Sequence, residues 1–83
     1  MAKKLAAKQA WEVLVHGGRD EWTWTVRDVA TDRETAEYIL SEKVAKYAAE
    51  YDNQAEAWVG MDGKDGEEVE IRLQETVIYS LIH

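Results

Sequence analysis

Two alternating runs surround a double glycine in residues 10–29, AWEVLVHGGRDEWTWTVRDV, and they set the architecture of the N-terminal half. In the first run, Trp11, Val13 and Val15 fall on one side of an extended chain, and the residues between them fall on the other. Residues 21–29 alternate in the same way. Because Gly17 and Gly18 tolerate positive φ angles, the two runs are predicted to form a β-hairpin around residues 17–20.

A change of period after residue 30 predicts a single helix. Apolar side chains recur at helical spacing up to residue 51, and neither Gly nor Pro interrupts them. Thr31 and Glu34 have the spacing of a capping box, which would start the helix. Asp52 and Asn53 are expected to end it, since Asn tolerates the left-handed conformation common after helices. The apolar stripe comprises Ala36, Ile39, Leu40, Val44, Tyr47, Ala48 and Tyr51.

The remaining sequence predicts two or three further strands. Residues 55–61 alternate so that Ala57, Val59 and Met61 would point inward and Trp58 outward, and a turn with two glycines follows at residues 62–66. Residues 67–74 alternate cleanly, whereas residues 76–82 are apolar on both sides. Without a turn signal between them, these two segments form either one long bent strand or two strands joined by a kink near Gln74.

The element order predicts an α+β fold, ββαββ or ββαβββ, in which a twisted antiparallel sheet of four to five strands carries one helix on one face. The expected contact joins Trp22, Trp24, Val59, Ile71 and Leu73 to the helical residues Leu40, Val44 and Tyr47. The other face would display Leu14, Trp58, Ile78 and Ile82. Two explanations for that apolar face stay open: the N-terminal segment folds over it through Leu5, or it is an interface.

The 83 residues are predicted to form a single α+β domain over residues 10–83, preceded by a basic and flexible segment, residues 1–9, with three lysines. The absence of Cys excludes disulfides and thiolate metal sites and fits a cytoplasmic protein. The apolar runs are too short for a transmembrane helix or a signal peptide. We therefore expect no membrane association.

Catalytic and metal-binding patterns are weak in this sequence. His16 lies beside a turn and His83 is the last residue, and neither Ser41 nor Ser80 has a His or Cys at motif spacing. Residues 62–68 superficially resemble a calcium loop, but Lys64 occupies a position that needs an oxygen ligand. We therefore expect no enzyme activity, no metal site and no cofactor.

Negative charge is concentrated in the second half of the chain. Residues 50–75 contain nine acids and two bases, which leaves −7, the formal net charge of the whole chain. Such a surface repels nucleic acid and membranes and attracts basic surfaces of a protein or a ribonucleoprotein complex. The alternative is a merely solvated face. The candidate partner-binding residues are Glu56, Asp62, Asp65, Glu67, Glu68 and Glu70.

The chain resembles, in its general character, the small inhibitors of phages and mobile elements, such as anti-CRISPR proteins. The shared character is that of a Cys-free acidic domain with one helix on a small antiparallel sheet and no catalytic group. The resemblance rests on no motif, so it assigns no residue. It implies a protein that blocks a host nuclease or nucleic-acid-binding complex in the host cytoplasm. The alternative is a homodimeric structural or adaptor module. Candidate interface residues for a dimer or a partner are Tyr38, Trp58, Ile78 and Ile82.

Overall fold

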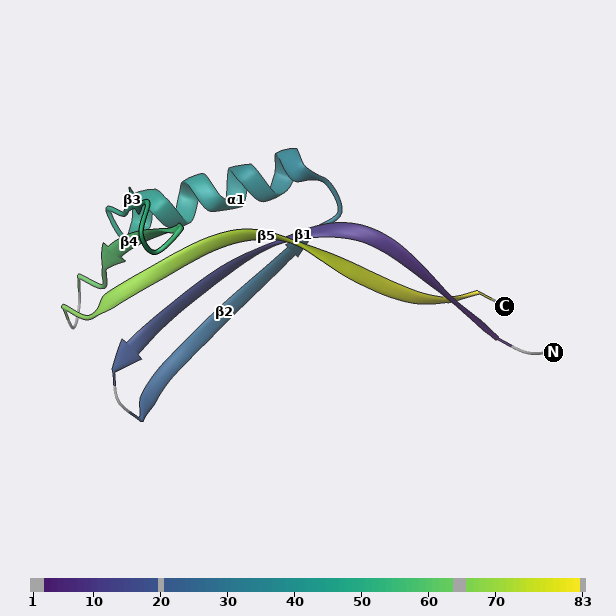
Figure 1. Cartoon of the computed structure of the whole chain (residues 1–83), viewed down its shortest axis with the longest axis horizontal. Coiled ribbons are helices and arrows are strands. Elements are labelled where there is room, and N and C mark those ends of the chain that lie inside the picture. The colour runs from purple at the N-terminus through teal and green to yellow at the C-terminus, as the bar shows by residue number, and fades with distance from the viewer. Residues whose placement is uncertain (1–2, 20, 64–65, 83) are drawn as a thin grey trace.

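The computed structural model describes residues 3–19, 21–63 and 66–82. Within these ranges it has the predicted α+β architecture, a five-stranded antiparallel sheet with one helix on one face (Figure 1). The strands follow the order β2-β1-β5-β4-β3 across the sheet. The elements are β1 (Lys4–Arg19), β2 (Trp22–Ala30), α1 (Arg33–Lys46), β3 (Glu50–Asp52), β4 (Ala57–Met61) and β5 (Glu68–Ile82).

The hairpin predicted from residues 10–29 is confirmed, but Gly17, Gly18 and Arg19 belong to β1 rather than to the turn. β1 and β2 pair antiparallel from Trp11 opposite Ala30 to Arg19 opposite Trp22. Gly18 is required because its φ is 94° and a Cβ atom at this position would lie 2.1 Å from the backbone carbonyl oxygen of Trp22. Asp20, which was predicted to belong to the turn, lies outside the described residues.

Helix α1 begins one residue later than the capping-box prediction places it. The N-cap is Asp32 rather than Thr31, and its carboxylate accepts hydrogen bonds from the backbone N–H of Thr35 at 2.9 Å and from its hydroxyl at 2.8 Å. These hydrogen bonds, led by the one from the backbone, lower the pKa of Asp32. A carboxylate at this position also interacts favourably with the positive end of the helix dipole.

The helix ends earlier than residue 51, so the prediction was wrong at this end. Its C-cap is Tyr47, and Ala48 has a positive φ of 48° that a continuing helix does not allow. The carbonyl of Tyr47 accepts a hydrogen bond from the N–H of Met61 at 3.1 Å, which joins the helix end to β4. Tyr51 therefore belongs to β3, a strand that the periodicity did not predict.

Residues 67–82 resolve the alternative left open by their sequence. β5 is one continuous strand, and its register with β1 is unbroken from Glu70 opposite His16 to Ile82 opposite Lys4. No kink separates the two halves at Gln74. The fifth strand of the sheet is therefore β3, not a separate C-terminal strand.

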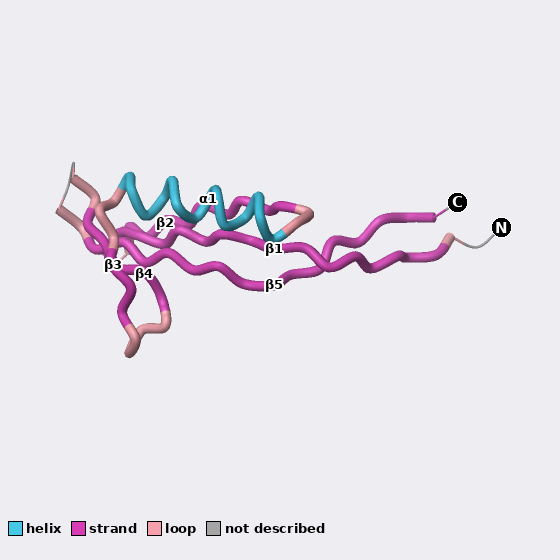
Figure 2. The backbone as a smooth tube through the Cα atoms, turned by 90° about the horizontal axis from the view of Figure 1, so that it is seen from above, coloured by secondary structure: helices cyan, strands magenta, loops and turns pink. Residues whose placement is uncertain are grey.

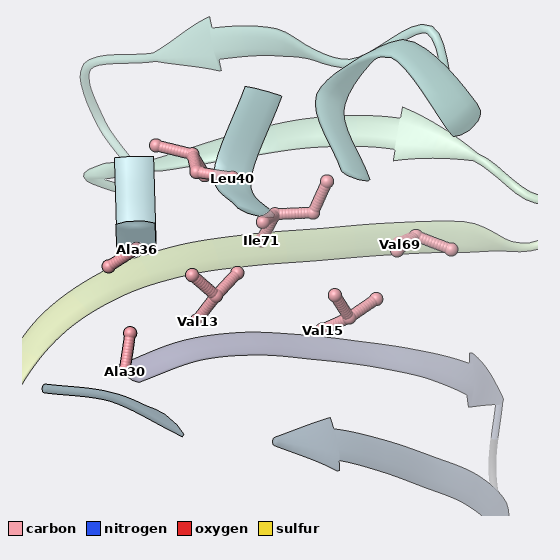
Figure 3. Close-up of a cluster of buried hydrophobic side chains, with 7 residues drawn as sticks. All are labelled: Val13, Val15, Ala30, Ala36, Leu40, Val69 and Ile71. Carbon is pink, nitrogen blue, oxygen red and sulfur yellow. The ribbon is translucent and has the colours of Figure 1, made fainter. Parts of the chain in front are cut away.

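The core lies between α1 and the sheet (Figure 3). Leu73, Val44 and Tyr47 pack against it as predicted, and so does Trp24. Trp22 does not, because it lies near the turn between β1 and β2 and is 81% exposed. The buried cluster comprises Val13, Val15, Ala30, Ala36, Leu40, Val69 and Ile71.

β4 presents the opposite face to the one predicted. Gly60 lies against the end of α1, since a Cβ atom there would be 2.4 Å from the carbonyl oxygen of Tyr47. Strand alternation then places Trp58 on the same side, opposite Ile71 and packed against the core. Val59 consequently points to the sheet face that lacks the helix, and the expected contact between Val59 and α1 is wrong.

The ends of β1 and β5 extend beyond the helix as a two-stranded ribbon (Figure 2). We call residues 4–9 and 77–82 the arm. The first six residues of β1 thus pair with β5 and do not fold over the open face, where Leu14 is half-buried. The arm makes the molecule 54 Å long and raises its radius of gyration to 15.7 Å. A compact domain of this length would have about 12 Å.

Candidate functional site

The sheet face opposite α1, here called the open face, carries a line of polar side chains across the strands. Residues directly opposite each other in an antiparallel ladder share a face. The registers therefore align Glu50, Val59, Glu70, His16 and Thr25 in one row. The His16 Nδ1 and Thr25 Oγ1 atoms are 2.9 Å apart. The row becomes acidic toward β3, where Glu50 and Glu70 flank Val59.

Carboxylates accumulate where β3, β4 and β5 meet, on the open face and the adjoining turn. We call this region the acidic end. Glu70 is 3.6 Å from Arg72. None of the other four forms an ion pair with any residue that the structure describes. The acidic end comprises Glu50, Asp52, Glu56, Glu68 and Glu70.

The structure separates the six acids predicted as one binding surface. Glu68 and Glu70 lie on the open face, as required. Glu56 lies in the turn before β4 with a positive φ of 53°, at the other end of that strand from Asp62 and Glu67. A five-residue strand is about 15 Å long, so Glu56 is well separated from Asp62 and Glu67, and also from Glu68, which pairs with Met61 at the same end of β4.

Two of the remaining predicted acids are engaged in local structure. The Glu67 carboxylate is 3.6 Å from Arg19 and is largely covered. Asp62 is half-buried, and its backbone forms hydrogen bonds with Glu67 and Gly66 at 2.8 and 2.7 Å. The third, Asp65, lies outside the described residues. Asp62 and Glu67 therefore contribute to the local structure between β4 and β5 rather than to the acidic end.

A shallow pocket of about 470 Å³ adjoins the acidic end. The turn beside it is held by Asp52, whose Oδ1 atom accepts hydrogen bonds from the N–H groups of Gln54 at 2.9 Å and Ala55 at 3.3 Å. The pocket lining contains two carboxylates, two amides, one valine and one tyrosine, and it has no histidine, serine or threonine. It is lined by Glu50, Tyr51, Asp52, Asn53, Gln54 and Val59.

The centre of the open face is closed by a polar network around Glu12. This side chain is 5% exposed, and its carboxylate accepts hydrogen bonds from Arg27 and from the Gln74 amide. Arg27 extends from β2 across β1 and also donates to the Thr76 hydroxyl on β5 at 3.3 Å. The network ties three strands together and makes this part of the face polar.

The four predicted interface residues do not form one surface. Tyr38 is exposed on the outer side of α1, where a hydrogen bond to Glu42 raises the pKa of its phenol. Ile78 and Ile82 lie on the arm, paired with Lys8 and Lys4. Trp58 contacts Tyr51 edge to face, with ring centroids 4.9 Å apart, and belongs to the core side.

Sequence reasoning missed Glu50 and Asp52 because both were assigned to a helix end. The three residues of β3 are too few to show a period, so only their pairing with β4 brings these acids onto the open face. The Glu12 network was missed for a related reason. Its hydrogen bonds join residues up to 62 positions apart, and no local pattern connects them.

Among the described residues, no group of three His, Cys, Asp or Glu side chains could hold a metal ion. In the same residues, no helix has the length and apolar character needed to cross a membrane. Comparisons with protein-family models, with curated proteins and with solved structures found no match to this chain.

Proposed function

We propose that this protein is a non-enzymatic inhibitor whose acidic end binds a basic surface of a partner protein or ribonucleoprotein complex. Basic surfaces of this kind commonly hold nucleic acid, so an acidic ligand would compete with nucleic acid for them. A host nuclease or surveillance complex is the proposed target, as for phage-encoded inhibitors acting in the host cytoplasm. The observation that carries the proposal is the group of carboxylates, four of them without an ion-pair partner among the described residues, on a face that α1 leaves open.

The spacing of the carboxylates supports joint action on one partner. Neighbouring strands are about 4.8 Å apart, so the backbones at Glu50 and Glu70 lie about 10 Å apart on either side of Val59. This distance is close to the Debye length at physiological salt, about 8 Å, so the charges act together on an approaching cation. Association should therefore be fast at low salt and slow at high salt.

Apolar groups between the acids support a specific interface rather than a purely solvated face. Val59 is half-buried and Met61 is 55% exposed, and both lie on the open face between the acidic strands. A typical interface has an apolar centre inside a polar rim. Here β4 supplies the apolar centre, whereas β3 and β5 supply the charged rim.

The test is a charge reversal at positions that form no ion pair with a described residue. Glu50→Lys with Glu68→Lys alters the acidic end, and Glu21→Lys with Glu75→Lys is the matched control with the same change in net charge. Each protein is used as bait in bacterial lysate at low and high salt. We expect the wild type and the control to retain a nucleic-acid-binding complex at low salt only, and the acidic-end variant to lose it.

Inhibition is measured on the captured complex. The wild-type chain, added in excess, should reduce its nuclease or nucleic-acid-binding activity, and the acidic-end variant should not. Equal retention of the complex by the acidic-end variant would refute the proposed surface. Retention without any effect on activity would refute the inhibitory role.

A further inference from the structure

The arm is a two-stranded ribbon without a covering layer. β2 pairs with β1 only from Trp11 onward, and β4 pairs with β5 only up to Ile71, so among the described residues no third strand reaches the arm. Two-stranded ribbons are marginally stable in water unless a further strand or a helix covers them. The large apolar side chains of the arm are between 38% and 69% exposed: Leu5, Val77, Ile78, Tyr79, Leu81 and Ile82.

The two edges of the arm differ in their protection against pairing. Natural edge strands are commonly blocked by lysines, prolines or bulges. The β1 edge carries Lys4 and Lys8, which would meet like charges if two copies paired there. The β5 edge has no charge, proline or glycine over residues 76–82, TVIYSLI, and its register contains no bulge. Only the β5 edge is therefore open to a further strand.

We propose that the free edge of β5 pairs antiparallel with the same edge of a second copy, which makes a four-stranded arm sheet in the order β1-β5-β5-β1. This inference does not depend on the proposed inhibitory function, because the strand pairing that it requires lies in the arm, at the other end of the molecule from β3 and β4 (Figure 1). The pairing is isologous, so it closes at two copies and leaves no second β5 edge for growth. Centred near Tyr79, it would place Val77 of each copy beside Leu81 of the other.

Charge favours a second copy as the occupant of this edge. The arm and the residue before it hold Lys3, Lys4 and Lys8 and no acid. Their formal charge is +3, so the rest of the chain has a formal charge of −10, which gives −7 for the whole. Antiparallel pairing along β5 directs the tip of the arm in one copy, where Lys4 pairs with Ile82, toward the start of β4 in the other copy. The lysines at the tip then approach the acidic β3–β4 turn, with Asp52 and Glu56 of the second copy.

Sedimentation equilibrium of the full chain between about 5 and 200 µM tests this proposal. We expect a monomer–dimer equilibrium whose dissociation constant Tyr79→Lys raises by at least about tenfold, because it places like charges close together across the two-fold axis. The matched control is Leu5→Lys, at an equally exposed position on the same face of the arm but on β1. It should change the dissociation constant by less than about threefold, because its strand is not at the new junction.

A second readout uses the absence of cysteine in the natural chain. Tyr79→Cys, at the two-fold axis, should give a disulfide-linked dimer on oxidation. Val77→Cys and Leu81→Cys would each lie about 13 Å from their own equivalents in the other copy, so they should remain largely monomeric, as should Leu5→Cys. A monomeric wild type over the whole concentration range would overturn the proposal. A dimer disrupted by Leu5→Lys but not by Tyr79→Lys would overturn the assignment to β5.

Discussion

Replacing Arg27 by Met should destabilise the protein because it leaves the buried carboxylate of Glu12 without its charged partner. Glu12 is 5% exposed, and its carboxylate is bound by Arg27 and by the Gln74 amide. Met retains most of the apolar stem of Arg27, so packing over the sheet changes little. The substitution therefore removes mainly the guanidinium and its hydrogen bonds to Glu12 and Thr76.

The expected loss is about 1–2 kcal/mol in the free energy of unfolding. Leaving a buried acceptor unsatisfied costs about 1–3 kcal/mol, and breaking a fully buried ion pair costs about 3–5 kcal/mol. The lower range applies because the Arg27 side chain is 55% exposed, so water reaches the vacated site. Gln74 also continues to donate to the Glu12 carboxylate. In a domain of this size, such a loss lowers Tm by about 4–16 °C.

The measurement is denaturant unfolding followed by tryptophan fluorescence at one fixed, low protein concentration. Arg72→Met is the control, because Arg72 lies 3.6 Å from Glu70 in an ion pair exposed on both sides and should contribute less than about 1 kcal/mol. Adding Glu12→Gln to Arg27→Met should recover part of the loss by removing the unpaired charge. The reasoning fails if Arg27→Met behaves like Arg72→Met, or if the double variant is no more stable than the single one.

Three further substitutions test the packing and the helix start. Ile71→Ala, at a fully buried site, should cost about 2–5 kcal/mol in a urea titration. Gly60→Ala should destabilise through backbone overlap with the Tyr47 carbonyl, measured as a lowered Tm with reduced helical circular dichroism. The hydrogen bond from the Thr35 N–H lowers the pKa of Asp32 in the folded protein. The Asp32 carboxylate therefore stabilises the fold fully when the pH is above the ordinary carboxyl pKa, and this stabilisation is lost as the pH falls through the lowered pKa. Asp32→Ala should remove this part of the acid dependence of Tm.

The elements that sequence predicted well are those with a strong local period. β2 and α1 extend over 9 and 14 residues, and residues 10–16 of β1 alternate cleanly, so a period of 2 or 3.6 stands out in each; residues 4–9 of β1 were predicted as a flexible segment instead. β3 has three residues, Glu50–Asp52, and lies directly after the helical stripe, so Tyr51 was assigned to the helix. α1 ends in a local motif, in which Ala48 has a positive φ and the N–H of Ala49 donates to the Val44 carbonyl at 2.9 Å, but Ala48 replaces the Gly or Asn that usually marks such an end in a sequence.

The orientation of β4 was wrong for a different reason. Both faces of residues 57–61 are apolar, so alternation alone cannot choose between Trp58 and Val59 as the inward residue. The deciding residue is Gly60, which allows the end of α1 to approach β4 closely. A glycine inside a strand is a recognised sign of such an approach, so the signal was present in the sequence.

The arm shows the limit of periodicity most clearly. Residues 4–9 combine lysines, alanines and a glutamine in no strand-like alternation, and residues 77–82 are apolar on both sides. Neither pattern predicts a strand with one buried face, since neither segment has one. Each becomes a strand through pairing with the other, a contact between residues as far apart as Lys4 and Ile82.

The acidic end and the arm lie at opposite ends of the long axis, so the chain separates its charges along its length (Figure 1). This separation couples the two proposals. If the arm lysines of one copy approach the acidic turn of the other, a basic partner bound at the acidic end competes with them. By thermodynamic reciprocity, partner binding then weakens the dimer by the same factor as dimerisation weakens partner binding. Asp52 and Glu56 lie at that turn, so reversing the charge of Glu56 should shift both equilibria, whereas Tyr79→Lys should relieve the competition and strengthen partner binding.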